Sequence, residues 1–153
     1  DYINEIVEHW ARLLPGQPAP DFTLKDVHGK YVTLSDYRGD YVYIMVWATW
    51  CVPCKSEFYY LDLLQKEYKD EKIKFMTISI DEPEMAQYWY DFLASKRYSG
   101  IHLMIDSDSK FNEDYMIISV PRFILIGTEG EIVDSNAPRP SGQIRQLLDS
   151  LIV

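Results

Sequence analysis

Residues 41–54 read YVYIMVWATWCVPC, a continuous apolar stretch followed directly by a tryptophan and the tetrapeptide Cys51-Val52-Pro53-Cys54. The seven apolar residues from Tyr41 to Trp47 are typical of a strand that is buried on both faces inside an α/β sheet. A helical pattern starts at Val52. The sequence therefore predicts a strand, a short turn and a helix, with the first cysteine at the edge of the sheet where the helix begins.

The two cysteines are the only ones in the chain, and their spacing favours a redox dithiol. The free N–H groups and the positive dipole end of the predicted helix favour a thiolate at Cys51, which is the expected nucleophile. Cys54 lies one turn further along the same helix. It is the expected resolving thiol, because it can attack a mixed disulfide on Cys51 and close the Cys51–Cys54 bond.

Two other uses of a Cys-x-x-Cys pair are a zinc site and a purely structural disulfide. Zinc prefers four ligands, whereas His9, His28 and His102 are scattered singly without metal-ligand spacing. A disulfide at this spacing closes a very small loop and constrains the unfolded chain little. The sequence therefore favours redox chemistry carried by the two thiols alone, with neither a metal nor a cofactor.

The composition indicates one globular domain with a sizeable core, since 47% of the 153 residues are hydrophobic. The net charge of −9 opposes binding to nucleic acid or an anionic lipid surface, so a protein partner or a small thiol is expected. There is no apolar run of membrane-spanning length and no signal peptide. Because the chain starts at Asp1, we expect a processed chain or an excised domain, with a membrane anchor possible only in a full-length precursor.

The pattern along the chain predicts an N-terminal amphipathic helix and linker over residues 1–15 and a single domain over residues 16–153. The apolar stripe of this first helix is expected to dock on the domain, although the helix would equally suit the end of a preceding region. The other expected elements are a hairpin with strands at 22–24 and 31–34, a helix from 52 to about 68, a strand at 73–80, a helix opened by Pro83, a strand at 102–105, a short helix at 107–115, a hairpin with strands at 122–126 and 131–133, and a closing helix from Ser141. This order predicts an α/β fold with a mixed central sheet flanked by helices.

Residues 47–54, WATWCVPC, resemble the active-site sequence of the thioredoxin superfamily, including the tryptophan directly before the nucleophile. Val120-Pro121 resembles the cis-proline site of that family, which faces the dithiol across the active-site groove. The resemblance implies a thioredoxin-like fold and disulfide exchange with protein substrates. The residues expected to contact the substrate are Trp50, Pro53, Val120 and Pro121.

Three details are similar to the extracytoplasmic thiol-disulfide oxidoreductases of the TlpA and ResA type. Residues 16–24, with Asp26 and Gly29, resemble their entry motif, and residues 82–105 resemble the helix and strand that this group inserts. Glu57 follows Cys54 by three residues, as in the pattern Cys-x-Pro-Cys-x-x-Glu. The resemblance covers residues 16 to about 152 and implies a location outside the cytoplasm, in the periplasm or cell envelope.

The chain departs from thioredoxin at Met45, where thioredoxins have a buried aspartate that exchanges protons with the second cysteine. Glu57 is the candidate replacement, because it sits one helical turn beyond Cys54 and can accept the thiol proton. The alternative is a solvated carboxylate that only balances Lys55 or Lys66.

Some aromatic and charged side chains near these motifs also have predicted places. Trp47 belongs to the core, whereas Trp50 is expected to contact the partner. Tyr88, Trp89 and Tyr90 are consecutive, so they cannot all face inward. Arg122 is expected to be solvated, with a positive rim near the thiolate as the alternative.

The residues thus predict a thiol-disulfide oxidoreductase, and the resemblance implies that it acts as a reductant, with protein thiol or disulfide substrates and an upstream electron-donor protein. A peroxiredoxin reading conflicts with Ile44 and Ala48, which occupy the Pro and Thr positions of the Pro-x-x-x-Thr-x-x-Cys frame. The alternative from another class is a copper-binding or partner-docking module that uses the Cys-x-x-Cys pair as a soft-metal clamp.

Overall fold

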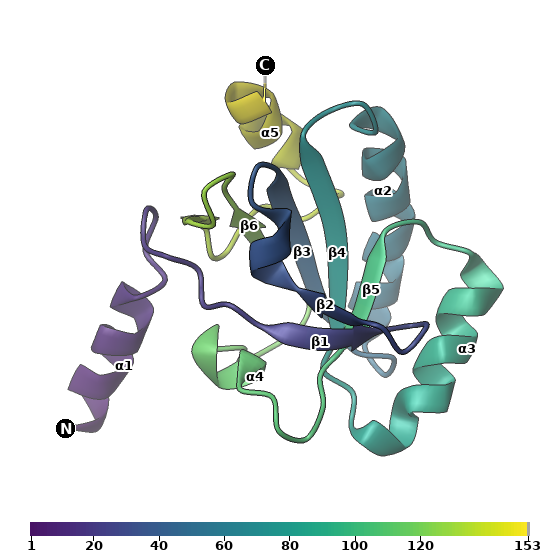
Figure 1. The fold of residues 1–153 in the computed structure, drawn as a ribbon, viewed down its shortest axis with the longest axis horizontal. Coiled ribbons are helices and arrows are strands. Elements are labelled where there is room, and N and C mark those ends of the chain that lie inside the picture. The colour runs from purple at the N-terminus through teal and green to yellow at the C-terminus, as the bar shows by residue number, and fades with distance from the viewer. Residues whose placement is uncertain (153) are drawn as a thin grey trace.

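The computed structural model describes residues 1–152 and contains a seven-stranded mixed sheet in the order β2-β1-β5-β4-β3-β6-β7 (Figure 1). The strands are β1 (Thr23–Asp26), β2 (Tyr31–Thr33), β3 (Tyr41–Trp47), β4 (Ile73–Ser79), β5 (Ile101–Met104), β6 (Arg122–Ile126) and β7 (Ile132–Asp134). The helices are α1 (Tyr2–Ala11), η1 (Leu34–Tyr37), α2 (Val52–Glu67), η2 (Pro83–Met85), α3 (Ala86–Lys96), α4 (Phe111–Asp114) and α5 (Ile144–Ile152). Residue 153, the last of the domain predicted over 16–153, lies outside the described residues.

Strand β3 lies between β4 and β6 in the sheet, parallel to β4 and antiparallel to β6. Its apolar residues alternate between two cores. Tyr43, Met45 and Trp47 face a core that includes residues of α2, α3 and α5, whereas Val42, Ile44 and Val46 face a second core on the opposite side of the sheet. Because both faces are covered, the strand is apolar throughout, as the sequence predicted.

The second face of the sheet is covered by smaller elements. Phe111 of α4, Leu34 of η1 and Leu13, which follows α1, belong to this core. The antiparallel pair β1 and β2 turns at Gly29, whose φ of 79° is the left-handed conformation that favours glycine. His28 lies in this turn, where its N–H donates to the carboxylate of Asp26 at 2.8 Å.

Helix α1 lies apart from the sheet, at the purple end of the chain in Figure 1. No residue between Tyr2 and Ala11 is buried, and the side chains of Ile3 and Val7 are 70% and 61% exposed. The expectation that the apolar stripe of this helix docks along the domain is therefore wrong for its first two turns. Contact with the second core is made only where the helix ends, by Trp10 and Leu13.

The predicted inserted segment contains η2, α3 and β5. Pro83 opens a 3-10 turn rather than the α-helix itself, which starts at Ala86. Strand β5 pairs in parallel with β4 and in antiparallel with β1, so the insertion joins the N-terminal hairpin to the rest of the sheet.

Candidate active site

Cys51 stands where β3 has ended and α2 begins, as the sequence predicted. It is the N-cap of α2, and its sulfur accepts a hydrogen bond from the backbone N–H of Cys54 at 3.2 Å. Pro53 occupies the first turn of the helix, where its missing N–H costs no hydrogen bond. The helix N-terminus therefore offers a donor and the positive end of its dipole to the Cys51 sulfur.

The two cysteines form a disulfide with their Cα atoms 5.3 Å apart. Cys51 is 5% exposed and Cys54 is fully buried. Of the two cysteines, Cys51 is therefore the more accessible. The roles of nucleophile for Cys51 and resolving thiol for Cys54 stay a prediction from the sequence.

The peptide bond between Val120 and Pro121 is cis, as the resemblance implied. It lies across from the dithiol, and the Cys51 sulfur is 3.8 Å from the carbonyl oxygen of Val120, although 69 residues separate them. The tertiary structure thus brings Val120 and Pro121 to the two cysteines.

Glu57 is not a solvated helix carboxylate. Its side chain is 6% exposed and accepts two hydrogen bonds from Ser141, one from the backbone N–H at 3.1 Å and one from the hydroxyl at 2.7 Å. Lys66, which the alternative interpretation paired with Glu57, instead pairs with Asp62 at 3.2 Å. Glu57 therefore lies inside the protein on the dithiol helix, and both of its carboxylate oxygens accept hydrogen bonds from donors of Ser141.

A groove of about 490 Å³ lies next to the dithiol. It is lined by Pro53 and Glu57 of α2 and by the cis-proline Pro121. The other lining residues are Ser119, Arg122, Phe123, Asn136, Ala137, Pro138 and Arg139. Glu57 therefore has a route to solvent along the same surface that carries the cis-proline.

The structure corrects the prediction that Arg122 is solvated. Its side chain is 8% exposed, and it donates from Nε to the carbonyl of Ser135 at 2.7 Å and from Nη1 to the carbonyl of Met116 at 2.9 Å. The guanidinium also lies over the ring of Trp10, 5.3 Å from its centroid. Arg122 is thus held by backbone carbonyls and an aromatic ring, a combination that its planar fork allows.

The aromatic residues divide as their spacing predicted. Trp47 is fully buried, whereas Trp50, next to Cys51, is 65% exposed. In α3, Trp89 is buried and its neighbours Tyr88 and Tyr90 are 58% and 45% exposed. An exposed tryptophan beside the nucleophile offers a flat apolar contact to a partner.

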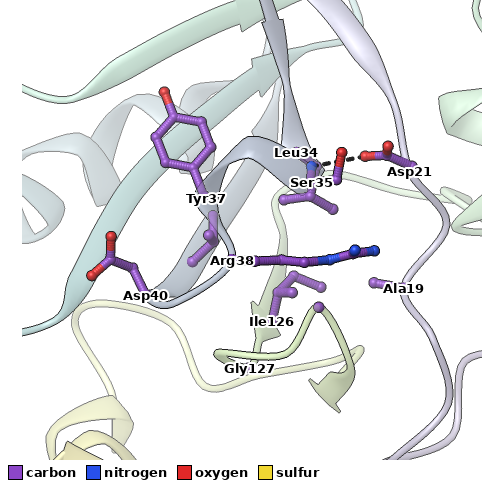
Figure 2. A pocket seen from close by; sticks show the side chains of 11 residues that line it. Ala19, Asp21, Leu34, Ser35, Tyr37, Arg38, Asp40, Ile126 and Gly127 are labelled. Carbon is purple, nitrogen blue, oxygen red and sulfur yellow. Dashed lines mark hydrogen bonds between the residues drawn. The ribbon is translucent and has the colours of Figure 1, made fainter.

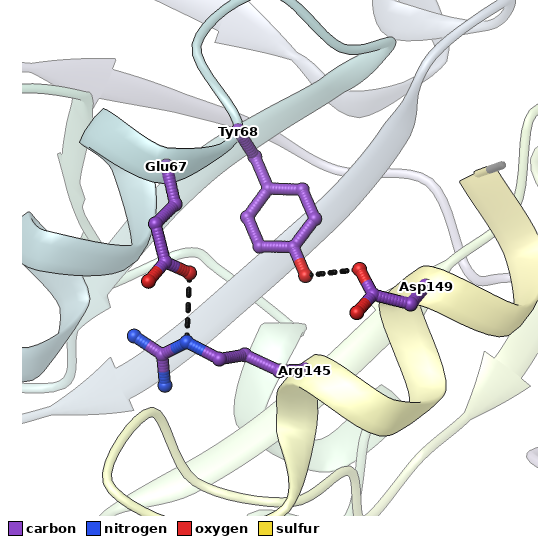
Figure 3. Close-up of polar contacts among 4 residues, drawn as sticks. All are labelled: Glu67, Tyr68, Arg145 and Asp149. Carbon is purple, nitrogen blue, oxygen red and sulfur yellow. Dashed lines mark hydrogen bonds and ion pairs between the residues drawn. The ribbon is translucent and has the colours of Figure 1, made fainter.

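Helices α2 and α5 are tied together at the far end of α2 (Figure 3). Tyr68 donates to the carboxylate of Asp149 at 2.6 Å, and Arg145 pairs with Glu67 at 2.7 Å. Burial, followed by the Asp149 hydrogen bond, raises the pKa of Tyr68 to about 12. These contacts hold α5 against α2, and the segment leading into α5 carries Ser141, the partner of Glu57.

Asp81 is a residue near the site that the sequence interpretation missed. It is 1% exposed and accepts hydrogen bonds from the backbone N–H of Thr49, at 3.0 and 3.2 Å, and from the Thr49 hydroxyl at 2.7 Å. Thr49 belongs to the turn that precedes Cys51. The available signal was an acidic residue, the first of the pair Asp81-Glu82, directly after the strand predicted over residues 73–80.

Three further observations on residues 1–152 concern metal binding, a small cavity and membrane spans. Residues 1–152 include no group of three or more His, Cys, Asp or Glu side chains placed to hold a metal ion. The small cavity of about 20 Å³ in Figure 2 lies around Leu34 and Arg38, and it is lined by none of the predicted site residues. Within the described range, no helix is both long and apolar enough to cross a membrane.

The sequence of this chain is similar to those of known proteins. Residues 15–135 match the AhpC/TSA family. The thiol-disulfide oxidoreductase ResA of Bacillus subtilis is 32% identical over 77% of this chain and 64% of its own length. ResA of Geobacillus kaustophilus is 31% identical over 86% of this chain and 73% of its own. The chain therefore spans less than two thirds of the Bacillus subtilis protein.

A solved structure from Bacteroides vulgatus, described as a candidate thiol-disulfide oxidoreductase, is similar over nearly the whole chain. It is 38% identical, covers 92% of this chain and 99% of its own, and superposes with a TM-score of 0.85. The thioredoxin-like fold expected from the resemblance is confirmed.

Proposed function

We propose that this protein reduces disulfides of protein substrates. The chain belongs to the AhpC/TSA family and to the thioredoxin-like thiol-disulfide oxidoreductases that include ResA. The observation that supports this most directly is the Cys51–Cys54 disulfide at the N-terminus of α2, opposite the carbonyl of Val120. A pair in this position can accept or release two electrons without any other group.

In the first step, the reduced enzyme attacks with the Cys51 thiolate. The substrate S–S bond breaks, a mixed disulfide forms between Cys51 and one substrate sulfur, and the other substrate sulfur leaves as a thiolate that takes up a proton. The N–H of Cys54 and the helix dipole stabilise the attacking thiolate before bond formation.

In the second step, Cys54 resolves the mixed disulfide. It loses its proton and attacks the Cys51 sulfur, the intramolecular disulfide forms, and the second substrate sulfur leaves as a thiolate that takes up a proton. We assign the acceptance of the Cys54 proton to Glu57, one helical turn away and open to the groove. The substrate has then gained two electrons and two protons, and a dithiol donor protein must reduce Cys51–Cys54 again.

The substrate is proposed to lie between Trp50 and Pro53 on one side and Val120 and Pro121 on the other. The backbone groups of Val120 are available to an extended peptide next to the sulfur, and Trp50 supplies exposed apolar surface. The family implies protein thiol or disulfide substrates. The location outside the cytoplasm and the upstream donor protein remain part of this proposal and rest on the resemblance to the TlpA and ResA type.

We also propose that residues 1–15 are a helix and linker outside the thioredoxin-like domain, which would begin at Gly16. The exposed stripe of α1 supports this division, and the family match starts at residue 15. The segment contacts the second core of the domain through Trp10 and Leu13.

The experiment that tests the function is the equilibrium reduction potential of the Cys51–Cys54 pair in graded thiol-disulfide buffers, together with the rate of insulin disulfide reduction. A potential near or below about −250 mV supports a reductant, whereas one near −120 mV would identify an oxidant and reverse the proposed direction. Absence of any thiol-disulfide exchange by the reduced protein would overturn the function itself.

A further inference from the structure

Asp81 is a buried carboxylate beside the active-site turn that the exchange reaction described above does not use. It follows β4 by two residues, and Ile80 between them donates its N–H to the carbonyl of Trp47 at 2.9 Å. Asp81 is therefore fixed next to the end of β3, where the chain leaves the sheet toward Cys51.

All contacts of this carboxylate come from neutral donors. Its two oxygens accept from the backbone N–H and hydroxyl of Thr49 and from the hydroxyl of Ser79, and its own N–H donates to that hydroxyl at 3.0 Å. Within residues 1–152, the ion pairs join Lys66 to Asp62 and Arg145 to Glu67, and neither involves Asp81. Burying an acidic side chain without a cation costs free energy of folding, so the hydrogen bonds from Thr49 and Ser79 must stabilise Asp81 in this position.

Asp81 holds one side of the turn formed by residues 48–51. The turn is closed by a hydrogen bond from the N–H of Cys51 to the carbonyl of Ala48 at 3.0 Å. Thr49 points inward to Asp81 and is 2% exposed, whereas the next residue, Trp50, is 65% exposed. The carboxylate thus links the turn to β4, and the turn ends at the nucleophile.

The position of this turn matters because the environment of the Cys51 sulfur is set by short contacts. The sulfur must stay over the N–H of Cys54 and close to the carbonyl of Val120. A turn that moves relative to β4 also moves the sulfur relative to the helix N-terminus, and hydrogen bonds weaken steeply as their geometry departs from alignment.

We infer that Asp81 is a positioning residue for the reaction: acting through Thr49, it holds the 48–51 turn so that the Cys51 sulfur stays aligned with the N-terminus of α2. This inference rests on the proposed function, since it concerns the reactivity of the same cysteine. Asp81 touches neither the substrate nor the sulfur in this role.

The test compares four variants in a Cys54→Ser background, in which only Cys51 can be alkylated. Thr49→Val keeps every charge and removes one hydrogen bond to Asp81, and Thr49→Ser restores the hydroxyl. Asp81→Asn removes the charge and leaves one acceptor for the N–H of Thr49. Thr77→Val is the matched control, because Thr77 is equally buried in β4 but bonds to His102 instead of the turn.

The expected readout is the rate of iodoacetamide alkylation of Cys51 as a function of pH. Near neutral pH we expect the rate to fall about threefold in Thr49→Val and about tenfold in Asp81→Asn, because the Cys51 thiolate loses alignment with its donor. Thr49→Ser is expected to react like the parent protein. Thr77→Val is expected to lose thermal stability without a change in the alkylation rate.

A second readout uses the intact Cys51–Cys54 pair. The equilibrium constant with glutathione is expected to shift toward the disulfide by about tenfold in Asp81→Asn, which corresponds to about 30 mV. If both Asp81→Asn and Thr49→Val lower the melting temperature but leave alkylation and the equilibrium constant unchanged, the inference is wrong and Asp81 is structural only.

Faster alkylation in Asp81→Asn, with no effect of Thr49→Val, would also overturn the inference, because the carboxylate would then act through its charge. If Asp81→Asn does not fold, the two Thr49 variants and the Thr77 control still decide the question. An inactive dithiol in the unsubstituted protein would instead refute the proposed function, so the two failures are distinguishable.

Discussion

Replacing Glu57 with glutamine separates the proposed proton transfer from the structural role of this side chain. The carboxylate accepts two hydrogen bonds from Ser141, at 3.1 and 2.7 Å. Glutamine keeps one acceptor for the Ser141 N–H, and the Ser141 hydroxyl can rotate to accept from the new NH₂ group. The side chain therefore remains bonded, but it can no longer take a proton from Cys54.

The cost in stability is expected to be modest. Hydrogen bonds to a charged group contribute about 1.5–3 kcal/mol, and the two bonds are weakened rather than lost, so we expect a loss of about 1–2 kcal/mol. For a domain of this size that corresponds to a fall in melting temperature of about 3–6 °C. The groove next to Glu57 admits water, which limits the cost further.

The effect on catalysis is expected to be larger. A positioned general base contributes about 10²–10⁴-fold, so resolution of the mixed disulfide should slow by at least about 100-fold near neutral pH. Without the base, the rate should follow the thiolate fraction of Cys54 alone and rise about tenfold per pH unit below the pKa of that thiol.

The assay is a stopped-flow reaction of the reduced protein with the aromatic disulfide DTNB. A first phase reports attack by Cys51 and a second phase reports release of the second aromatic thiol by Cys54. The second phase should disappear in Cys54→Ser. The matched control is Glu67→Gln on the same helix, since Glu67 is exposed and pairs with Arg145 (Figure 3). An unchanged second phase in Glu57→Gln across acidic and neutral pH would refute the proton transfer.

Three further predictions concern stability and partner contact. The pKa of Tyr68 is raised in the folded state to about 12 from 10.0, so its contribution to stability is present below pH 10 and is lost as the pH rises toward 12. The free energy of unfolding should therefore fall less steeply across this pH range in Tyr68→Phe than in the parent protein. An equal slope in both proteins would contradict the prediction. Deleting residues 1–9 should change the free energy of unfolding by no more than about 0.5 kcal/mol in urea titrations, because α1 buries no side chain, and a larger loss would show that the helix is part of the domain. Trp50→Ala should lower kcat/KM for insulin reduction by about tenfold and leave the first DTNB phase unchanged, and equal effects on both substrates would exclude a role in protein contact.

Local features of the chain were sufficient to predict the elements around the dithiol. The bounds predicted for β3 and β6 are those observed, because continuous apolar runs can be stable only inside a covered sheet. The start of α2 was also predicted, since the change from an apolar run to helical spacing occurs within a few residues of Cys51. The exposure of the apolar stripe of α1 was less predictable, because amphipathic spacing indicates a helix and does not indicate what covers its apolar side.

The sequence by itself therefore determined the strand, the turn and the helix that carry Cys51 and Cys54, since these depend on interactions between near neighbours. Only the tertiary structure decided which polar side chains are buried beside them. Glu57 meets Ser141 from 84 residues away, and Asp81 meets Thr49 from 32 residues away. Hydrophobic periodicity reports which face of an element is apolar, but the burial of Glu57 and Asp81 also depends on hydrogen-bond partners that distant parts of the chain supply.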